Sequence, residues 1–445
     1  MTTLRRTFTN LARPALFAAI LCAAFSFYVS KGMEDRGLNA PPESGDGHDY
    51  DAIAFNLWKY DRFGYDWDDP RWRQPYLNNP EYDDLLRRHS TYYPTTYKQP
   101  AVPLVMAVVD AATRRSFAAW RVVNCAITAG AVTAAAAISA TCAGWPAAVI
   151  TAVIVLTLSL PTLFAHQFMT EGLATFLVTL LTWRWIENRR RGWTTANAAG
   201  SGLILGALAA TRSVFVLCMA IALFAPGVNR RSGTRPLSGR AICLLAALLV
   251  IGPWWVRNTV VLHTFMPLGT QGALNMPAGF GPRALRYEGL WGANPGDGAE
   301  EIAALNLGTV AAEVRLAKFR SHLTLEWMRA HPRDVVRLMA LHVWQEIKPR
   351  RLPYPTDAWL LPAAALAAWV LRRSPGVGII VAMTAANLVG IALTWSMAGR
   401  FMAPVQPILA ALVGALVVVF ARRVGSTILP GRFRDQRGEQ SSPPQ

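Results

Sequence analysis

Three carboxylates close together near the amino terminus are candidates for proton-transfer chemistry. Asp46, Asp49 and Asp51 follow an apolar segment, and glycines 45 and 47 flank the first of them. A carboxylate at such a turn can accept the proton of a hydroxyl group or orient that group for attack. Asp46 is the first candidate for a general base. Asp49 and Asp51 can also serve only the structure of the loop.

Positive charge that could act on a phosphate occurs at three later positions, Lys98, Arg212 and Arg257. Cations can offset the charge of a phosphate that leaves during group transfer. Arg212 stands out because an arginine between two apolar segments is costly unless it is paired or functional. Glu171 begins an earlier apolar segment and could be its partner. The alternative for Glu171 is a charge favoured by a helix N-terminus.

Membrane helices are the elements that would carry these residues. Hydrophobic residues make up 53% of the chain and the mean hydropathy is +0.25. Several apolar runs approach the ~20 residues needed to cross a bilayer, where helices satisfy their own backbone groups. We therefore predict an all-α polytopic membrane protein. The net charge of +17 comes from Lys and Arg at segment ends, which indicates a lipid bilayer as partner and no nucleic acid.

Two polar loops interrupt the apolar segments. Of the 27 acidic residues, 13 fall between Glu34 and Asp84, which marks residues 31–99 as a large first outer loop. Residues 264–354 form a second outer loop. We expect about ten membrane spans within residues 1–421, followed by a basic tail at 422–445. The apolar segments are 16–30, 101–113, 118–142, 146–165, 169–186, 196–210, 213–225, 241–256, 356–371, 375–397 and 402–421.

Basic residues predict the orientation. Arginines 189–191, residues 229–240, arginines 372–373 and the tail should be cytoplasmic, with both large loops outside. The first span is expected to be uncleaved, so both termini are cytoplasmic. Three crossings then fit between the first loop and residue 191. Residues 101–118 would dip into the membrane or join the next segment as one bent element.

Two amphipathic helices are expected along the membrane surface. Residues 50–58 and 333–348 both place apolar side chains at helical spacing. Prolines between positions 60 and 97 exclude one long helix there.

Five short motifs in order resemble a known family. They cover about residues 14–280 and are Asp46-x-x-x-Tyr50-x-x-Ile53-Ala54, Lys98-Gln-Pro100-Ala-Val-Pro103, Thr170-Glu171-Gly172, Gly202 to Arg212, and Pro253-Trp-Trp-Val-Arg257-Asn258. Together they resemble the GT-C glycosyltransferases. These include polyprenyl- or dolichyl-phosphate-sugar-dependent protein mannosyltransferases and lipid A aminoarabinose transferases.

The resemblance implies a role for each motif residue. Asp46 takes the general-base position, with Asp49 as a second catalytic candidate. Acceptor or sugar contacts fall to Tyr50 and Tyr97. Aminoarabinose transferases have a second acidic residue where this chain has Tyr97, so Asp49 or Glu81 would have to replace it. The residues implied in donor phosphate or sugar binding are Lys98, Glu171, Arg212, Arg257 and Asn258.

The implied activity is that of an inverting glycosyltransferase of a bacterial inner membrane. It would move a sugar from a polyprenyl-phosphate donor to a cell-envelope lipid, glycan or protein acceptor on the outer face. A transporter or flippase of a lipid-linked glycan is the alternative, although the spans show no clear repeat and few midplane charges. A catalytically inactive scaffold is a third. A divalent cation is compatible with these residues but not required, and His48 alone does not define a metal site.

Overall fold

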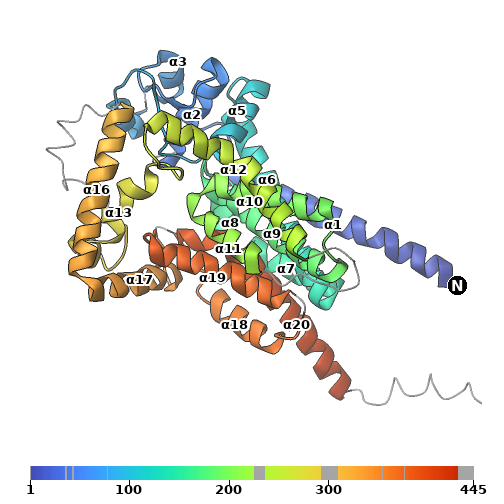
Figure 1. The fold of residues 1–445 in the computed structure, drawn as a ribbon. Helices are drawn as coiled ribbons and strands as arrows, with labels where there is room; N and C mark the ends of the chain where they lie inside the picture. Colours follow the sequence, from blue (N-terminus) through green and yellow to red (C-terminus); the bar gives the residue numbers. More distant parts are fainter. Residues whose placement is uncertain are drawn as a thin grey trace, which may run out of the picture.

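The computed structural model of the chain is almost entirely helical (Figure 1). It describes residues 2–35, 38–42, 45–77, 79–224, 236–291, 309–352, 354–374 and 376–428. Within these ranges the sheet content is one antiparallel pair, β1 (Gly64–Tyr65) and β2 (Tyr93–Pro94). The predicted all-α class is confirmed.

Four helices in the described part of the chain are long and apolar enough to cross a membrane. Their lengths meet the requirement of ~20 residues. The predicted total of about ten spans stays a prediction. The four spans are Pro14–Glu34 in α1 (Thr2–Asp35), Phe117–Ala143 (α6), Gly239–Leu262 in α12 (Pro236–Leu262), and Arg400–Val424 in η5 (Arg400–Val405) with α20 (Gln406–Ile428).

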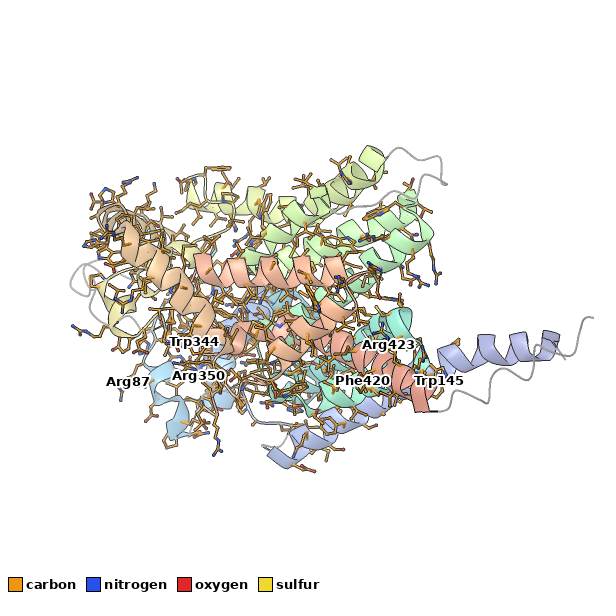
Figure 2. All side chains as sticks on the ribbon, turned by 90° about the horizontal axis from the view of Figure 1, so that it is seen from below. Arg87, Trp145, Trp344, Arg350, Phe420 and Arg423 are labelled. Carbon is orange, nitrogen blue, oxygen red and sulfur yellow. The ribbon has the colours of Figure 1, made fainter. Side chains whose placement is uncertain are left out.

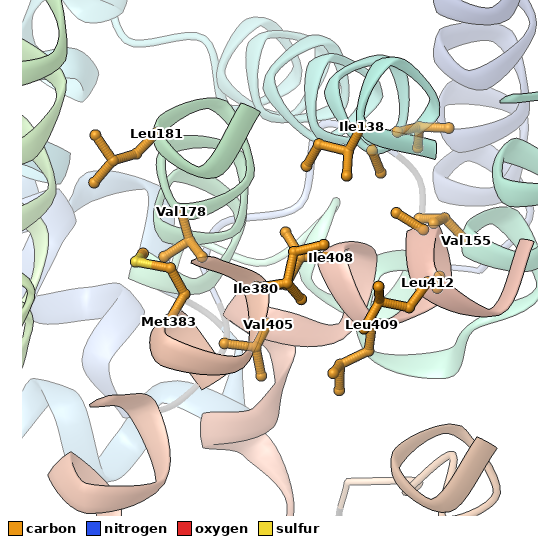
Figure 3. Close-up of a cluster of buried hydrophobic side chains, with 14 of the residues drawn as sticks. Ile138, Val155, Val178, Leu181, Ile380, Met383, Val405, Ile408, Leu409 and Leu412 are labelled. Carbon is orange, nitrogen blue, oxygen red and sulfur yellow. The ribbon is translucent and has the colours of Figure 1, made fainter. Parts of the chain in front are cut away.

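Nine further helices in the described residues complete the apolar body. Figure 3 shows Ile138, Val178, Ile380 and Ile408 meeting in its core. A side chain at Gly202 would place its Cβ 2.1 Å from the carbonyl oxygen of Cys243, so glycine permits close helix packing here. These helices are α5 (Ala101–Thr113), α7 (Trp145–Thr157), α8 (Ser159–Phe164), α9 (Thr170–Arg191), α10 (Thr195–Thr211), η3 (Ser213–Val216), α11 (Leu217–Phe224), α18 (Leu360–Val370) and α19 (Val377–Leu393).

The two polar loops gather at one end of the molecule, away from the first residues of α1 and the last of α20 (Figure 1). The first loop contains α2 (Asp46–Tyr60), α3 (Pro70–Arg73), η1 (Gln74–Tyr76), η2 (Pro80–Tyr82) and α4 (Asp83–Leu86). The second contains α13 (Gln271–Gly279), α14 (Pro282–Arg286), α16 (Val310–Ala330) and α17 (Pro332–Ile347). That both loops lie on the outer face of a membrane stays a prediction.

The basic last turns of α20 lie at the other end of the molecule (Figure 2). Arg422 of α20 lies beside Gly144, which joins α6 to α7: a Cβ added to this glycine would be 3.4 Å from Nη2 of Arg422. Figure 2 shows Trp145 and Arg423 at this end, and Arg87 at the opposite end. The side of the membrane on which each end lies stays a prediction. Most of residues 229–240 and of the tail lie outside the described residues.

The structure differs from the sequence-based boundaries in three places. Arg114 and Arg115 have φ of 58° and 65°, which separates α5 from α6, so the two are not one bent helix. The predicted helix at 50–58 exists as α2, but most residues of its first three turns are buried in protein, so its apolar side chains do not lie on the membrane surface. The last helix continues to Ile428, beyond the expected end at 421. The helix predicted at 333–348 is confirmed as α17.

Candidate active site

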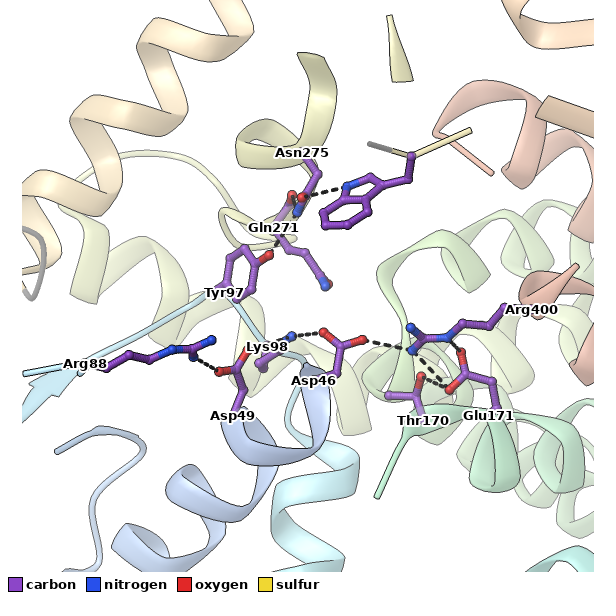
Figure 4. Close-up of polar contacts among 11 residues, drawn as sticks. Asp46, Asp49, Arg88, Tyr97, Lys98, Thr170, Glu171, Gln271, Asn275 and Arg400 are labelled. Atoms are coloured by element: carbon purple, nitrogen blue, oxygen red, sulfur yellow. Dashed lines mark hydrogen bonds and ion pairs between the residues drawn. The ribbon is translucent and has the colours of Figure 1, made fainter. Parts of the chain in front are cut away.

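A chain of ion pairs joins residues from five separate parts of the sequence, and Figure 4 shows all of them except Arg212. Four cations and three carboxylates alternate along it, so it carries one excess positive charge if every group is ionised. In spatial order they are Arg88, Asp49, Lys98, Asp46, Arg400, Glu171 and Arg212. We call these seven residues the ion network.

Asp46 occupies the centre of the ion network. One carboxylate oxygen accepts a hydrogen bond from Nζ of Lys98, and the other lies 2.9 Å from Nη2 of Arg400. Burial acts to raise the pKa of Asp46, but its two cationic partners outweigh burial and hold the pKa well below its ordinary value. Asp46 is therefore ionised at neutral pH. Its side chain keeps 28% exposure, the largest of the three carboxylates.

Lys98 links the two carboxylates of the α2 start. Its Nζ lies 3.0 Å from Asp49, and only 1% of its side chain is exposed. Burial acts to lower the pKa of Lys98, but Asp46 and Asp49 outweigh burial and raise it well above its ordinary value. The ammonium group is also 5.2 Å from the Tyr50 ring centroid and 4.8 Å from that of Tyr97. Lys98 is thus a buried positive charge with aromatic rings beside it.

Glu171 forms the other arm of the ion network. It is fully buried and accepts hydrogen bonds from Nε of Arg400 at 2.5 Å and from Nη1 of Arg212 at 3.2 Å. The expected pairing of Glu171 with Arg212 is confirmed. The guanidinium carbon of Arg212 also lies 4.1 Å from the Phe401 ring centroid. Two arginines on one buried carboxylate leave positive charge free to interact with an added anion.

Local backbone geometry explains how the carboxylates reach this place. Asp46 and Asp49 lie in the first turn of α2, where the helix dipole favours negative charge. Gly45 precedes them with φ of +83°, a conformation that favours glycine. The tight turn expected at this glycine is confirmed.

The segment that carries Lys98 is fastened to the second outer loop. Glu313 of α16 accepts hydrogen bonds from the backbone and hydroxyl of Thr96, at 3.1 and 3.0 Å. Gln99 donates to the carbonyl of Leu268 at 2.9 Å. The two loops therefore place Lys98 jointly.

Arg257 and Asn258, predicted to bind donor, form no direct ion pair or hydrogen bond with the ion network among the described residues. Arg257 donates to the carbonyl oxygens of Thr95 at 2.8 Å and Phe63 at 2.9 Å. Asn258 donates to the carbonyl of Pro267 at 2.9 Å and is fully buried. Both residues hold the loops that surround Lys98.

Asp51 faces away from the ion network and organises the first loop. It is 1% exposed and accepts hydrogen bonds from the indole of Trp72 and the hydroxyl of Tyr76. Nη2 of Arg115 lies 2.6 Å from it. With its oxygens taken by these donors, Asp51 has the structural role that the sequence left open.

Asn275 links two aromatic side chains near Lys98. Its amide donates to the Tyr97 hydroxyl at 3.1 Å and accepts from the indole of Trp291 at 3.3 Å. Figure 4 shows Gln271, one turn earlier in α13, pointing towards the space above Asp46. Amides and aromatic rings are groups that can contact the hydroxyls and faces of a sugar.

Arg400 and Arg88 were missed by the sequence analysis. Arg400 lies between the apolar segments 375–397 and 402–421, so the reasoning applied to Arg212 would have found it. Arg88 lies in a loop rich in charge and carries no such signal. Within the described residues, no three His, Cys, Asp or Glu side chains are grouped closely enough to hold a metal ion.

Comparisons with known proteins identify the fold. Neither a family model nor a curated protein matches the sequence. Among solved structures, two of ArnT from Cupriavidus metallidurans match, one in the apo state and one bound to undecaprenyl phosphate. Each has a TM-score of 0.53 and 13% identity, and each match covers 94% of this chain and 63% of ArnT. The apo oligosaccharyltransferase of Archaeoglobus fulgidus matches with a TM-score of 0.51 and 11% identity over 93% of this chain and 52% of that protein.

A further structure of the Archaeoglobus fulgidus enzyme, AglB, holds an inhibitory peptide and a dolichol-phosphate and matches with a TM-score of 0.50. This chain spans less than two thirds of the length of either protein. The chain has the fold of these GT-C membrane glycosyltransferases, so the resemblance recognised from the five motifs is confirmed at the level of fold.

Proposed function

We propose that this protein is an inverting glycosyltransferase that uses a polyprenyl-phosphate-linked sugar as donor. One observation carries the proposal: both oxygens of the partly exposed Asp46 are held by cations, Lys98 and Arg400, that a phosphate would also attract. The base candidate and the phosphate-binding candidates are thus in direct contact. The solved structures of similar fold, with undecaprenyl phosphate in ArnT and dolichol-phosphate in AglB, support a lipid phosphate as the ligand.

The donor phosphate would compete with Asp46 for its two cations. As Lys98 and Arg400 turn towards the phosphate, Asp46 loses the charges that hold its pKa down, and it becomes a stronger base. Arg212, which shares Glu171 with Arg400, adds to the charge around the phosphate. Donor binding would therefore prepare the base for the acceptor.

The transfer step then follows from these positions. The acceptor oxygen forms a bond to the anomeric carbon from the face opposite the phosphate, while the bond from that carbon to the phosphate oxygen breaks. The electron pair of the broken bond leaves with the polyprenyl phosphate, whose charge the cations stabilise. The acceptor proton passes to Asp46. Attack from the opposite face inverts the anomeric configuration.

Asp49 would replace the second acidic residue of the aminoarabinose transferases, at whose position this chain has Tyr97. It lies 3.0 Å from Nζ of Lys98, whereas Glu81 is an exposed residue of η2. Asp49 would keep Lys98 charged and oriented after Asp46 is released. Tyr50 and Tyr97, whose rings both lie close to Nζ of Lys98, would contact the sugar or the acceptor.

The proposed location is the bacterial inner membrane, with residues 31–99 and 264–354 on the outer face and both termini in the cytoplasm. Residues 1–421 would form the catalytic membrane domain and 422–445 a cytoplasmic tail. The acceptor would be a cell-envelope lipid, glycan or protein. Polyprenyl-phosphate sugars are anchored in the bilayer, which suits a site at the polar end of apolar helices.

The decisive experiment incubates the purified protein in nanodiscs with undecaprenyl-phosphate hexoses and pentoses and with envelope acceptors from a deletion strain. Mass spectrometry then looks for glycosylated acceptor and free undecaprenyl phosphate. We expect both products, and neither with Asp46→Asn. Reconstituted vesicles in which the lipid-linked sugar crosses the bilayer unconsumed would support a flippase instead.

A further inference from the structure

The turn that carries Arg400 has an unusual backbone. Between α19 and η5, Ala398 and Gly399 have φ of 58° and 103°, both in the left-handed region. Such a conformation is costly for alanine and persists only where surrounding contacts stabilise it. Something outside the turn must therefore hold it.

The carboxylate of Glu346 in α17 supplies those contacts. It is 1% exposed and accepts hydrogen bonds from the Ser396 hydroxyl at 2.8 Å, the backbone N–H of Met397 at 2.6 Å and that of Phe401 at 2.8 Å. All three neighbours donate, which suits a carboxylate as acceptor, although burial raises the pKa of Glu346 above its ordinary value. Among the described residues, Glu346 makes no ion pair with Lys, Arg or His.

The helix that bears Glu346 is also tied to the earlier part of the second outer loop. One turn earlier, the fully buried His342 contacts the carbonyl oxygens of Gly279 at 2.9 Å and Ala392 at 3.2 Å. The backbone N–H of Trp291 donates to the carbonyl of Ser396 at 2.8 Å. The loop, the helix and the turn therefore form one connected unit behind Arg400.

We infer that Glu346 is a positioning residue, which folds the 396–401 turn and so holds Arg400 between Asp46 and Glu171. The inference rests on the proposed function only in that Arg400 is taken to bind the donor phosphate. Through α17, the second outer loop also determines where this guanidinium lies. Glu346 does not touch the ion network itself and acts through the backbone of the turn.

The test measures the accessibility of Arg400 directly. Purified protein in nanodiscs is treated with phenylglyoxal, which modifies accessible guanidinium groups, and mass spectrometry follows the peptide that contains Arg400. In the wild type this side chain is 7% exposed and doubly paired, so modification should be slow. In Glu346→Gln the amide NH2 replaces one carboxylate oxygen, so in either orientation it faces a backbone N–H, that of Met397 or that of Phe401. One of these hydrogen bonds is then lost, the turn opens, and we expect modification about tenfold faster.

Asp357→Asn is the matched control. Asp357 lines the same small cavity as Glu346, but it accepts from the backbone N–H of Ser159 at 3.0 Å and not from the Arg400 turn. In Asp357→Asn, phenylglyoxal should modify Arg400 at the same rate as in the wild type. An unchanged rate in folded Glu346→Gln, or an equal rise in both variants, would overturn the inference. If Glu346→Gln does not fold, Ser396→Ala, which removes one donor to Glu346, decides in the same way with a smaller expected rise.

A second readout separates positioning from general stability. Undecaprenyl phosphate affinity is measured for Glu346→Gln, Arg400→Gln and the double variant. If Glu346 acts through Arg400, the double variant should bind no more weakly than Arg400→Gln alone, and additive losses would contradict the inference. A wild type that binds no undecaprenyl phosphate would refute the proposed donor, while the phenylglyoxal result would still decide the role of Glu346.

Discussion

Nη2 of Arg400 lies 2.9 Å from Oδ2 of Asp46, although 354 positions separate them in the chain. The first turn of α2, which follows α1, thus meets the start of η5, which leads into α20. The base candidate is bound by a cation that only the complete fold brings to it. Its chemistry therefore depends on how the two ends of the membrane domain pack.

Asp46→Asn should abolish sugar transfer while leaving the protein folded. The amide keeps the size of the side chain but cannot take the acceptor proton, so we expect a loss on the order of a hundredfold or more. Transfer of labelled sugar from a polyprenyl phosphate in membranes is the measurement. Asp49→Asn is the comparison and should lose less, because it disturbs Lys98 but spares the base. If Asp49→Asn is inactive and Asp46→Asn is normal, the base has been assigned to the wrong carboxylate.

Arg400→Gln should weaken binding of undecaprenyl phosphate roughly tenfold or more, because charged hydrogen bonds to the phosphate are lost. Arg400→Lys and Arg212→Lys should keep part of the affinity, since they retain the charge but not the planar fork. Displacement of a labelled lipid from nanodiscs gives the affinity. The control is Arg372→Gln, an exposed arginine between α18 and α19. Equal binding by Arg400→Gln and the wild type would remove Arg400 from the phosphate site.

Asp51→Asn should destabilise the protein instead of acting on catalysis. Removing one partner of the buried pair with Arg115 leaves an uncompensated charge, at a cost of about 3–5 kcal/mol. Thermal unfolding and limited proteolysis of the first loop would report this loss. Asp84→Asn provides the control in the same loop, because its pair with Arg87 is exposed and should contribute little. A fully stable Asp51→Asn would contradict the role given to this residue.

The pH dependence should differ between free protein and donor complex. Lys98 and Arg400 lower the pKa of Asp46 in the folded protein. Their ion pairs with Asp46 therefore stabilise the fold at pH values above the ordinary Asp pKa of about 4. This stability is lost as pH falls through the lower folded pKa. Wild-type thermal stability should therefore decrease more than that of Asp46→Asn between about pH 5 and 3.

Donor binding should move this titration upwards. Once the phosphate takes Lys98 and Arg400 from Asp46, the carboxylate pKa rises, so the acid limb of kcat should lie at higher pH than that of kcat/KM. Rate measurements with saturating and limiting donor separate the two limbs. Coincident limbs would show that the cations stay on Asp46 throughout.

Cysteine labelling tests the orientation. In a background without the five native cysteines, a membrane-impermeant reagent should label Asn79→Cys in intact cells. Position 436, which lies outside the described residues, should be labelled only after lysis. Labelling of position 436 in intact cells would reverse the predicted topology.

The sequence alone determined the class of protein and most residues of the candidate site. Long apolar runs predict helices because lipid offers no partner to backbone groups, and the positions of Asp46, Lys98, Glu171 and Arg212 follow from local pattern or family resemblance. Arg212 could be singled out because a charge between apolar segments needs a partner. Its expected pairing with Glu171 was correct.

Only the tertiary structure decided how these groups are connected. Whether a carboxylate is a base or a structural anchor depends on its neighbours, and Asp46 and Asp51 share one helix yet meet different cations. Arg400 and Glu346 come from distant segments whose pairing is set by helix packing, which no local pattern encodes. Coulomb interactions depend on distance in space and not along the chain. Most residues of the ion network could therefore be predicted from the sequence, but which of them contact one another is known only from the tertiary structure.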